Sequence, residues 1–180
     1  MPAPDVMERV LFTEKDIKER CQQLADQISK DYANSEPVLV CTLKGGFMFF
    51  SDLVKKINCD FSIEYIKASS YIGAQTSGNV TLQNFVNFEV KNKDILIIED
   101  IVDTGLTCEK LISYFNEKGA KSVEICTMLD KKERRLVHIE PKYVGFAIPN
   151  YFVIGYGLDY NEKYRNIPAV GIMNMKYVEK

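Results

Sequence analysis

The stretch Asp94–Thr107, with the sequence DILIIEDIVDTGLT, decides the fold of this chain. Its unbroken aliphatic run, Ile95–Ile98, is typical of a strand covered on both faces in a parallel sheet. The residues that follow have helical spacing, since Leu111 and Phe115 lie four apart, and Gly119 is expected to end the helix. We therefore predict a strand, a loop and a helix, with the loop at the carboxyl edge where open α/β sheets bind ligands.

The loop of this stretch combines the features of a phosphate site with acidic side chains. Thr104, Gly105 and Thr107 offer hydroxyls and an approachable backbone where the helix begins, and a helix N-terminus presents unpaired N–H groups. Three carboxylates in the same loop would repel a phosphate unless they face sugar hydroxyls, a metal ion or a proton: Glu99, Asp100 and Asp103. The pattern favours a sugar phosphate. An acidic loop that merely caps a helix is the alternative.

Other phosphate-binding signatures are missing from the sequence. The chain has no G-x-x-x-x-G-K-[ST] motif for a nucleoside triphosphate and no G-x-G-x-x-G motif for a dinucleotide. With His138 as the only histidine, in a charged segment without clear patterning, a nucleophile activated by histidine is disfavoured. A carboxylate is therefore the favoured general base.

The composition is that of one globular domain. The chain has 180 residues, of which 46% are hydrophobic and 27% charged. A net charge of -2 gives no general attraction to nucleic acid, and no apolar run approaches the length of a membrane helix. The start, MPAPDVMERV, lacks the features of a signal peptide, so we expect a cytoplasmic protein without nucleic-acid or membrane partners. Its 5 cysteines lack C-x-x-C spacing and are expected to be reduced core residues.

Apolar strands and amphipathic helices are predicted along the rest of the chain. Glu14–Lys30 has apolar residues at helical spacing, and Thr13 can cap its start. We expect a second helix that carries Phe47, Phe50, Leu53 and Val54, a hairpin arm over Val80–Val90, and strands at Val38–Leu43, Asp60–Ala68, Ser122–Leu129 and Tyr143–Ile148.

A second ligand loop is predicted at Lys44, Gly45 and Gly46, directly after a strand. The two glycines would let the backbone approach a polyanion, and the lysine would supply countercharge. A tight strand-to-helix turn would use the same glycines, so both interpretations stay open. The same holds for the long polar segment Ser69–Asn79, which is either an idle surface loop or a lid over a ligand.

The segment Ile97–Thr107 resembles the phosphoribosyl-pyrophosphate motif of the type I phosphoribosyltransferase family. Leu43–Gly46, Ser70–Tyr71 and Phe152–Arg165 narrow this resemblance to the hypoxanthine-guanine branch of the family. The matching pieces cover most of the chain. The resemblance implies an α/β fold with a parallel central sheet flanked by helices, in a single domain of residues 1–180. It also implies a small hood lobe, formed mainly by the N-terminal segment and about residues 149–180, and a flexible lid loop.

The resemblance further implies a transferase of purine salvage with Mg²⁺ as its cofactor. Such an enzyme moves a 5-phosphoribosyl group from phosphoribosyl pyrophosphate to N9 of hypoxanthine or guanine, and the products are IMP or GMP and pyrophosphate. Acceptance of xanthine stays open. Relatives form dimers and tetramers, so a homo-oligomer is expected, and a cis peptide before Lys44 is a common feature of the family.

Residue roles follow from the same resemblance. Asp103 would be the general base that takes the proton from N7 of the purine, and its placement beside a phosphate cradle agrees with this. Lys131 would contact the 6-oxo group, and Phe152 would stack on the purine. The implied metal site is Glu99, Asp100 and Asp159. The implied substrate-binding residues are Lys44, Gly45, Ser70, Tyr71, Glu99, Asp100, Thr104, Gly105, Leu106, Thr107, Lys131, Phe152, Val153, Asp159 and Arg165.

Two alternative functions have to be distinguished from this one. A phosphoribosyltransferase for adenine or a pyrimidine would share most of these motifs. A regulatory RNA-binding protein on the same fold would need a broad basic face with interleaved aromatic residues. The basic run Lys131–Arg135 is short and contains Glu133, which disfavours the second alternative. Apart from Lys131, this run is expected to be a solvated face.

Overall fold

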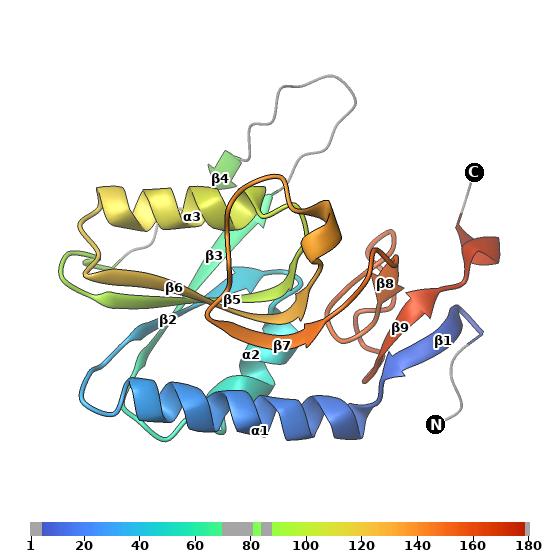
Figure 1. Ribbon diagram of the computed structural model, residues 1–180, viewed down its shortest axis with the longest axis horizontal. Coiled ribbons are helices and arrows are strands. Elements are labelled where there is room, and N and C mark those ends of the chain that lie inside the picture. Colours follow the sequence, from blue (N-terminus) through green and yellow to red (C-terminus); the bar gives the residue numbers. More distant parts are fainter. Residues whose placement is uncertain (1–4, 70–80, 84–87, 179–180) are drawn as a thin grey trace.

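The computed structural model describes residues 5–69, 81–83 and 88–178 (Figure 1). The predicted lid, including Ser70 and Tyr71, lies outside these residues. The elements in chain order are β1 (Met7–Phe12), α1 (Glu14–Asp31), β2 (Val38–Leu43), α2 (Phe47–Val54), β3 (Ser62–Ser69), β4 (Thr81–Gln83), β5 (Asp94–Val102), α3 (Leu106–Glu117), β6 (Ser122–Asp130), the single-turn helix η1 (Lys132–Arg134), β7 (Tyr143–Ala147), β8 (Val153–Ile154), β9 (Val170–Met173) and η2 (Met175–Tyr177).

The central sheet has the strand order β4-β3-β2-β5-β6-β7 among the described residues. β3, β2, β5, β6 and β7 are parallel, and β4 pairs antiparallel with β3 at the edge. The pairs Cys41 with Ile98 and Ile98 with Cys126 keep β2, β5 and β6 level with one another. The predicted parallel sheet is confirmed, and the loops that leave these three strands meet at one edge.

Both faces of the sheet are covered by helices, α1 and α2 on one side and α3 on the other (Figure 1). Leu96 and Ile98 belong to the core cluster with α1 and α2, whereas Ile95 and Ile97 belong to the cluster with α3. All four side chains are 0% exposed. An unbroken aliphatic strand is stable here because each of its faces packs in a core.

β5 is longer than the sequence predicted. The aliphatic run ends at Ile98, where we expected the loop to begin, but the strand continues to Val102. β6 explains the difference, because it pairs with β5 from Asp94 opposite Ser122 to Val102 opposite Asp130. The acidic residues Glu99 and Asp100 therefore lie on a paired strand, so their backbone is held by the sheet.

A second, antiparallel sheet forms from the two ends of the described chain. Its strand order is β1-β9-β8, and Figure 1 shows it beside the carboxyl edge of the central sheet. It uses residues from both ranges for which a hood was predicted. That this unit acts as a hood within a single domain stays a prediction.

Four of the five cysteines are buried and Cys59 is half-buried, and all five are free thiols, in agreement with the expected reduced state. Burial raises the pKa of Cys21 to about 11, so this thiol is uncharged near neutral pH. Within the described residues, no helix combines the length and the apolar character needed to cross a membrane.

Thr13 caps α1 as predicted. Its hydroxyl accepts from the Asp16 N–H, and the Asp16 carboxylate accepts from the Thr13 N–H at 2.8 Å, so the two residues form a capping box. We predict that Thr13→Ala lowers the free energy of unfolding by about 1 kcal/mol. Thr13→Ser, which keeps the hydroxyl, should stay close to the wild type in the same chemical denaturation experiment. Equal losses in both variants would mean that the cap hydroxyl is not the stabilising group.

Candidate active site

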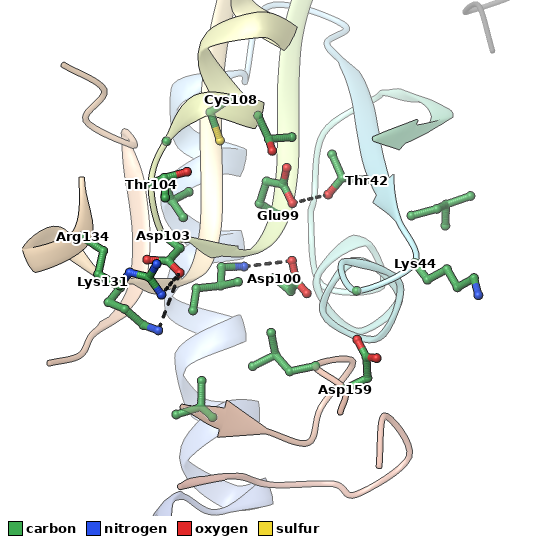
Figure 2. A pocket seen from close by; sticks show the side chains of 18 of the residues that line it. Thr42, Lys44, Glu99, Asp100, Asp103, Thr104, Cys108, Lys131, Arg134 and Asp159 are labelled. Atoms are coloured by element: carbon green, nitrogen blue, oxygen red, sulfur yellow. Dashed lines mark hydrogen bonds and ion pairs between the residues drawn. The ribbon is translucent and has the colours of Figure 1, made fainter. Parts of the chain in front are cut away.

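A pocket of about 460 Å³ lies at the carboxyl edge of the central sheet (Figure 2). Three loops build it, which follow β2, β5 and β6, and the segment from β8 onward closes its other side. Most of the predicted site residues line this pocket: Lys44, Gly45, Glu99, Asp100, Asp103, Thr104, Gly105, Thr107, Lys131, Phe152, Val153, Asp159 and Arg165. Leu106 begins α3 but does not line the pocket, and Ser70 and Tyr71 fall outside the described residues.

The start of α3 faces the pocket with backbone N–H groups. Gly105, directly before the helix, has a φ of 83° and no side chain that could cap it. A Cβ at this position would lie 2.7 Å from Cδ of Arg135, so glycine is required both by conformation and by space. Thr104 and Thr107 flank it with hydroxyls. Uncapped N–H groups at a helix start suit a phosphate group.

Two adjacent carboxylates, Glu99 and Asp100, lie at the centre of the pocket. Glu99 is 6% exposed, and the Thr42 hydroxyl contacts its Oε2 at 2.6 Å (Figure 2). Burial and the charge of Asp100 raise the pKa of Glu99 to about 8. Burial also raises the pKa of Asp100. A bound cation would therefore favour the ionised form of the pair.

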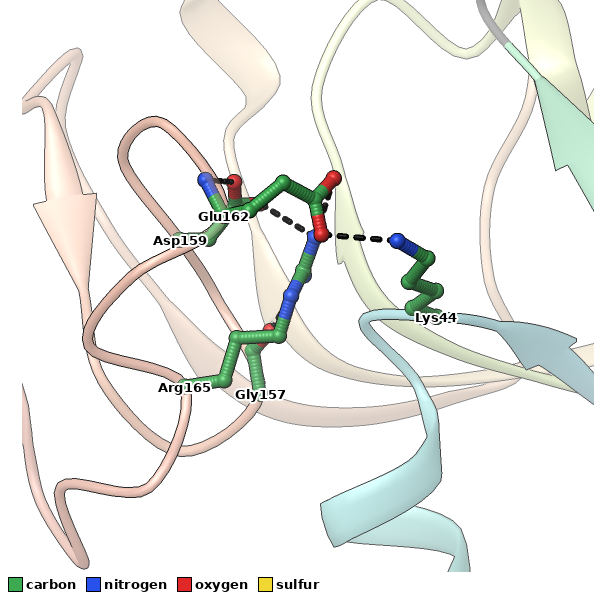
Figure 3. Close-up of polar contacts among 5 residues, drawn as sticks. All are labelled: Lys44, Gly157, Asp159, Glu162 and Arg165. Carbon is green, nitrogen blue, oxygen red and sulfur yellow. Dashed lines mark hydrogen bonds and ion pairs between the residues drawn. The ribbon is translucent and has the colours of Figure 1, made fainter.

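The Lys44 loop packs directly against these carboxylates. A side chain at Gly45 would collide with the Asp100 carboxylate, so only glycine allows this close approach. The peptide bond between Leu43 and Lys44 is cis. Lys44 extends from the loop toward the segment after β8, where its ammonium donates to Glu162 at 2.7 Å (Figure 3).

Arg165 extends into the pocket from the segment after β8, opposite the Lys44 loop. Its guanidinium donates to the Gly157 carbonyl at 2.7 Å and pairs with Asp159 at 2.8 Å and with Glu162 at 3.5 Å (Figure 3). Glu162 thus bridges Arg165 and Lys44, which come from different parts of the fold. These two cations face the region between the Lys44 loop and Asp159, as a site for a multiply charged anion requires.

Asp103 lies at the other end of the pocket, beside two cations. Its Oδ2 is 3.9 Å from Nζ of Lys131 and 3.4 Å from Nη1 of Arg134 (Figure 2). Its Oδ1 is buried and has no hydrogen-bond partner among the described residues. Lys131 is 5% exposed, and burial lowers its pKa. A ligand that reached this end could therefore meet a proton acceptor and a donor side by side.

An aromatic side chain also lines the pocket. Phe152 lines the pocket while 47% exposed, and its ring meets that of Tyr160 edge-on with centroids 6.0 Å apart. Val153 follows on β8 and adds backbone polar groups to the same wall. An exposed ring at a pocket wall can stack on a flat heterocycle.

Charges of both signs balance in this pocket. Among the described residues that line it, four are acidic and four basic: Glu99, Asp100, Asp103, Asp159, Lys44, Lys131, Arg134 and Arg165. The described residues contain no group of three or more His, Cys, Asp or Glu side chains that could hold a metal ion alone. Glu99 and Asp100 can still supply hard oxygen ligands to Mg²⁺, which usually takes its remaining ligands from water and substrate phosphates.

Seven pocket residues were not among the predicted site residues: Thr42, Leu43, Ile101, Val102, Cys108, Arg134 and Leu158. Thr42 could have been predicted as a pocket residue, because it immediately precedes the Leu43–Gly46 loop in the sequence. The charged sequence around Arg134 predicts a solvated face, but the turn of η1 brings this residue to Asp103. Cys108 and Leu158 are buried residues whose spacing resembles that of ordinary core positions.

Comparison with known proteins identifies the family. The family described as "Phosphoribosyl transferase domain" matches residues 11–161. A hypoxanthine-guanine phosphoribosyltransferase of Staphylococcus aureus strain Mu50 is 45% identical over 168 residues, which cover 93% of this chain and 94% of the relative. One from Streptococcus thermophilus strain CNRZ 1066 is 41% identical over 175 residues, 97% of each chain.

A solved structure agrees with these sequence matches. The crystal structure of a hypoxanthine phosphoribosyltransferase from Staphylococcus aureus superposes with a TM-score of 0.92 at 43% identity, over 97% of this chain and 96% of that one. Sequence and structure together show that the chain belongs to the phosphoribosyltransferase family, among the hypoxanthine-guanine phosphoribosyltransferases.

Proposed function

We propose that this protein transfers the 5-phosphoribosyl group of phosphoribosyl pyrophosphate to N9 of hypoxanthine or guanine, as an enzyme of purine salvage. The observation that carries the proposal is the placement of Lys131 and Asp103 side by side, next to the uncapped start of α3. This arrangement offers a donor for the purine 6-oxo group, an acceptor for the N7 proton, and N–H groups for a 5′-phosphate. The relatives are named hypoxanthine-guanine phosphoribosyltransferases, which supports the same substrates for this chain.

The reaction requires alignment and charge stabilisation more than a protein nucleophile. Displacement at the anomeric carbon passes through an oxocarbenium-like state, in which N9 forms a bond as the bond to pyrophosphate breaks. Asp103 accepts the N7 proton as N9 attacks. Lys44 and Arg165 bind the departing pyrophosphate from opposite sides, in place of Glu162.

Mg²⁺ fits the acidic end of the site, where Glu99, Asp100 and Asp159 would hold it directly or through water. The ion, when bound, neutralises pyrophosphate as a leaving group. Two features of the structure support this cofactor. Glu99 and Asp100 are adjacent carboxylates, and burial raises the pKa values of both, so a bound cation would stabilise their ionised forms. The balanced charges of the pocket also leave no excess of cations for a polyanionic substrate.

The proposal includes a cytoplasmic location and a homo-oligomer. The free thiols suit a reducing compartment. Exposed apolar side chains on α2 and β3, namely Phe47, Ile63 and Tyr65, provide surface that a second copy of the chain could cover.

A panel of nucleobases tests the proposed function. With phosphoribosyl pyrophosphate and Mg²⁺, we predict that hypoxanthine and guanine give IMP and GMP with stoichiometric pyrophosphate, and that a chelator stops the reaction. Adenine and uracil should give no product, because neither presents the purine 6-oxo group to Lys131. Preferred transfer to adenine or to a pyrimidine would contradict the proposal, and so would no turnover with any base. Chromatography of the nucleotides decides the outcome.

Lys131 should determine the choice of nucleobase. Hypoxanthine and guanine share a 6-oxo acceptor, whereas adenine presents a donor there. We predict that Lys131→Ala raises KM for hypoxanthine about tenfold or more, as expected for loss of a hydrogen bond from a charged group. KM for phosphoribosyl pyrophosphate should change much less. Lys131→Met, which keeps an apolar stem in this buried position, should show the same separation; equal effects on both substrates would place the lysine elsewhere.

Asp103 should act as the general base. Asp103→Asn keeps the shape of the side chain but accepts a proton poorly, so kcat should fall by about 10²- to 10⁴-fold. Binding of GMP to the variant, measured by calorimetry, should remain close to that of the wild type. If Asp103 only orders its loop, phosphate affinity and thermal stability would fall together. A folded variant with nearly normal kcat would refute the assignment.

A further inference from the structure

Arg134 lies at the pocket although its sequence context indicated a solvated face. It ends the single-turn helix η1, three residues after Lys131 on the segment that leaves β6. Its Nη1 is 3.4 Å from Oδ2 of Asp103, closer than Nζ of Lys131 at 3.9 Å (Figure 2). The Arg134 side chain is 51% exposed, whereas that of Lys131 is 6% exposed. The two cations therefore approach one carboxylate oxygen from different environments.

The turn that carries Arg134 is fixed to the loop that carries Asp103. Arg135, the next residue, donates from Nε to the Asp103 carbonyl at 3.2 Å and from Nη2 to the Val102 carbonyl at 3.4 Å. The Leu136 N–H donates to the Thr104 carbonyl at 2.9 Å. The distance between Arg134 and Asp103 is therefore set by backbone contacts on both sides of the pair.

The other side of the turn is also held. The carboxylate of Glu133 accepts from the backbone N–H of Asn150 at 3.1 Å, which ties η1 to the segment after β7. Arg135 also pairs with the buried carboxylate of Asp130 at the end of β6. A fixed backbone reduces the conformational entropy that Arg134 loses when it pairs with Asp103.

The position of Arg134 affects how strongly Asp103 and Lys131 pair with each other, and both groups have to stay available for the nucleobase. Lys131 must keep its donors for the 6-oxo group, and Asp103 must keep an oxygen for the N7 proton. A tight pair between them would occupy both groups, because opposite charges this close attract strongly in a partly buried site. Arg134 supplies a nearer countercharge for Oδ2, which leaves the Lys131 ammonium at 3.9 Å, beyond hydrogen-bonding distance.

We infer that Arg134 is a positioning residue, which holds Asp103 by Oδ2 and thereby keeps Lys131 free to bind the nucleobase. This inference rests on the proposed function, because it assigns a partner to the two groups that select and deprotonate the purine. Arg134 acts on the substrate only through Asp103 and Lys131. Its loss should therefore affect the nucleobase and leave phosphoribosyl pyrophosphate almost unaffected.

The test compares Arg134→Gln with Lys132→Gln. Lys132 lies in the same turn, is exposed and does not line the pocket. Its replacement by glutamine removes one positive charge, as the replacement of Arg134 does. In Arg134→Gln, kcat/KM for hypoxanthine should fall about fivefold, the upper range for a half-exposed ion pair, while KM for phosphoribosyl pyrophosphate changes less than twofold. Lys132→Gln should match the wild type, and Arg134→Lys should recover part of the loss.

Each outcome separates this inference from the proposed function. Equal kinetics in Arg134→Gln and Lys132→Gln, with an active wild type, would overturn the inference alone. A parallel loss for hypoxanthine and phosphoribosyl pyrophosphate in Arg134→Gln would also overturn it, because a positioning residue for Asp103 acts at the nucleobase. A wild-type chain that transfers to neither hypoxanthine nor guanine would overturn the proposed function, and the inference with it.

Discussion

The parallel pairing of β5 with β2 on one side and with β6 on the other is the constraint on which the site depends. The strands are level, so the loops that follow Leu43, Val102 and Asp130 leave the sheet at the same edge. The pairing is stable because each face of the aliphatic run Ile95–Ile98 packs in its own core. A slip of one residue in β5 would exchange the two faces and turn Glu99 and Asp100 away from the positions they now hold.

Electrostatics divides the pocket into two ends. At one end the carboxylate of Glu99 is buried next to the partly buried Asp100, and neither forms an ion pair among the described residues, an arrangement that is costly unless a ligand or a metal ion compensates it. At the other end Asp103 is held between two basic side chains from one turn. The acidic end thus suits a metal-bound pyrophosphate, and the other end suits a heterocycle that exchanges one proton. A ribose between them would place its anomeric carbon between leaving group and nucleophile.

Much of this arrangement could be predicted from the sequence, and the limits have physical reasons. The aliphatic run and the Asp-Thr-Gly loop are local signals, and they located the central strand, the start of α3 and most pocket residues. The extension of β5 past Ile98 depends on β6, which supplies hydrogen bonds that no local pattern reveals. Arg134 resembles its charged neighbours in sequence, and only the contacts of Arg135 and Glu133 direct it to Asp103. Thr42 on β2 contacts Glu99 on the neighbouring strand β5, and no local pattern in the sequence indicates this contact either.

The carboxyl edge of the sheet should bind a purine nucleotide in one orientation, which a crystal structure of the protein with GMP can test. We expect the 5′-phosphate at the backbone of residues 104–107, the guanine 6-oxo group at Lys131, and the ring against Phe152. A nucleotide bound in the reverse orientation, with its phosphate at Lys131, or bound outside this pocket, would rule out this orientation.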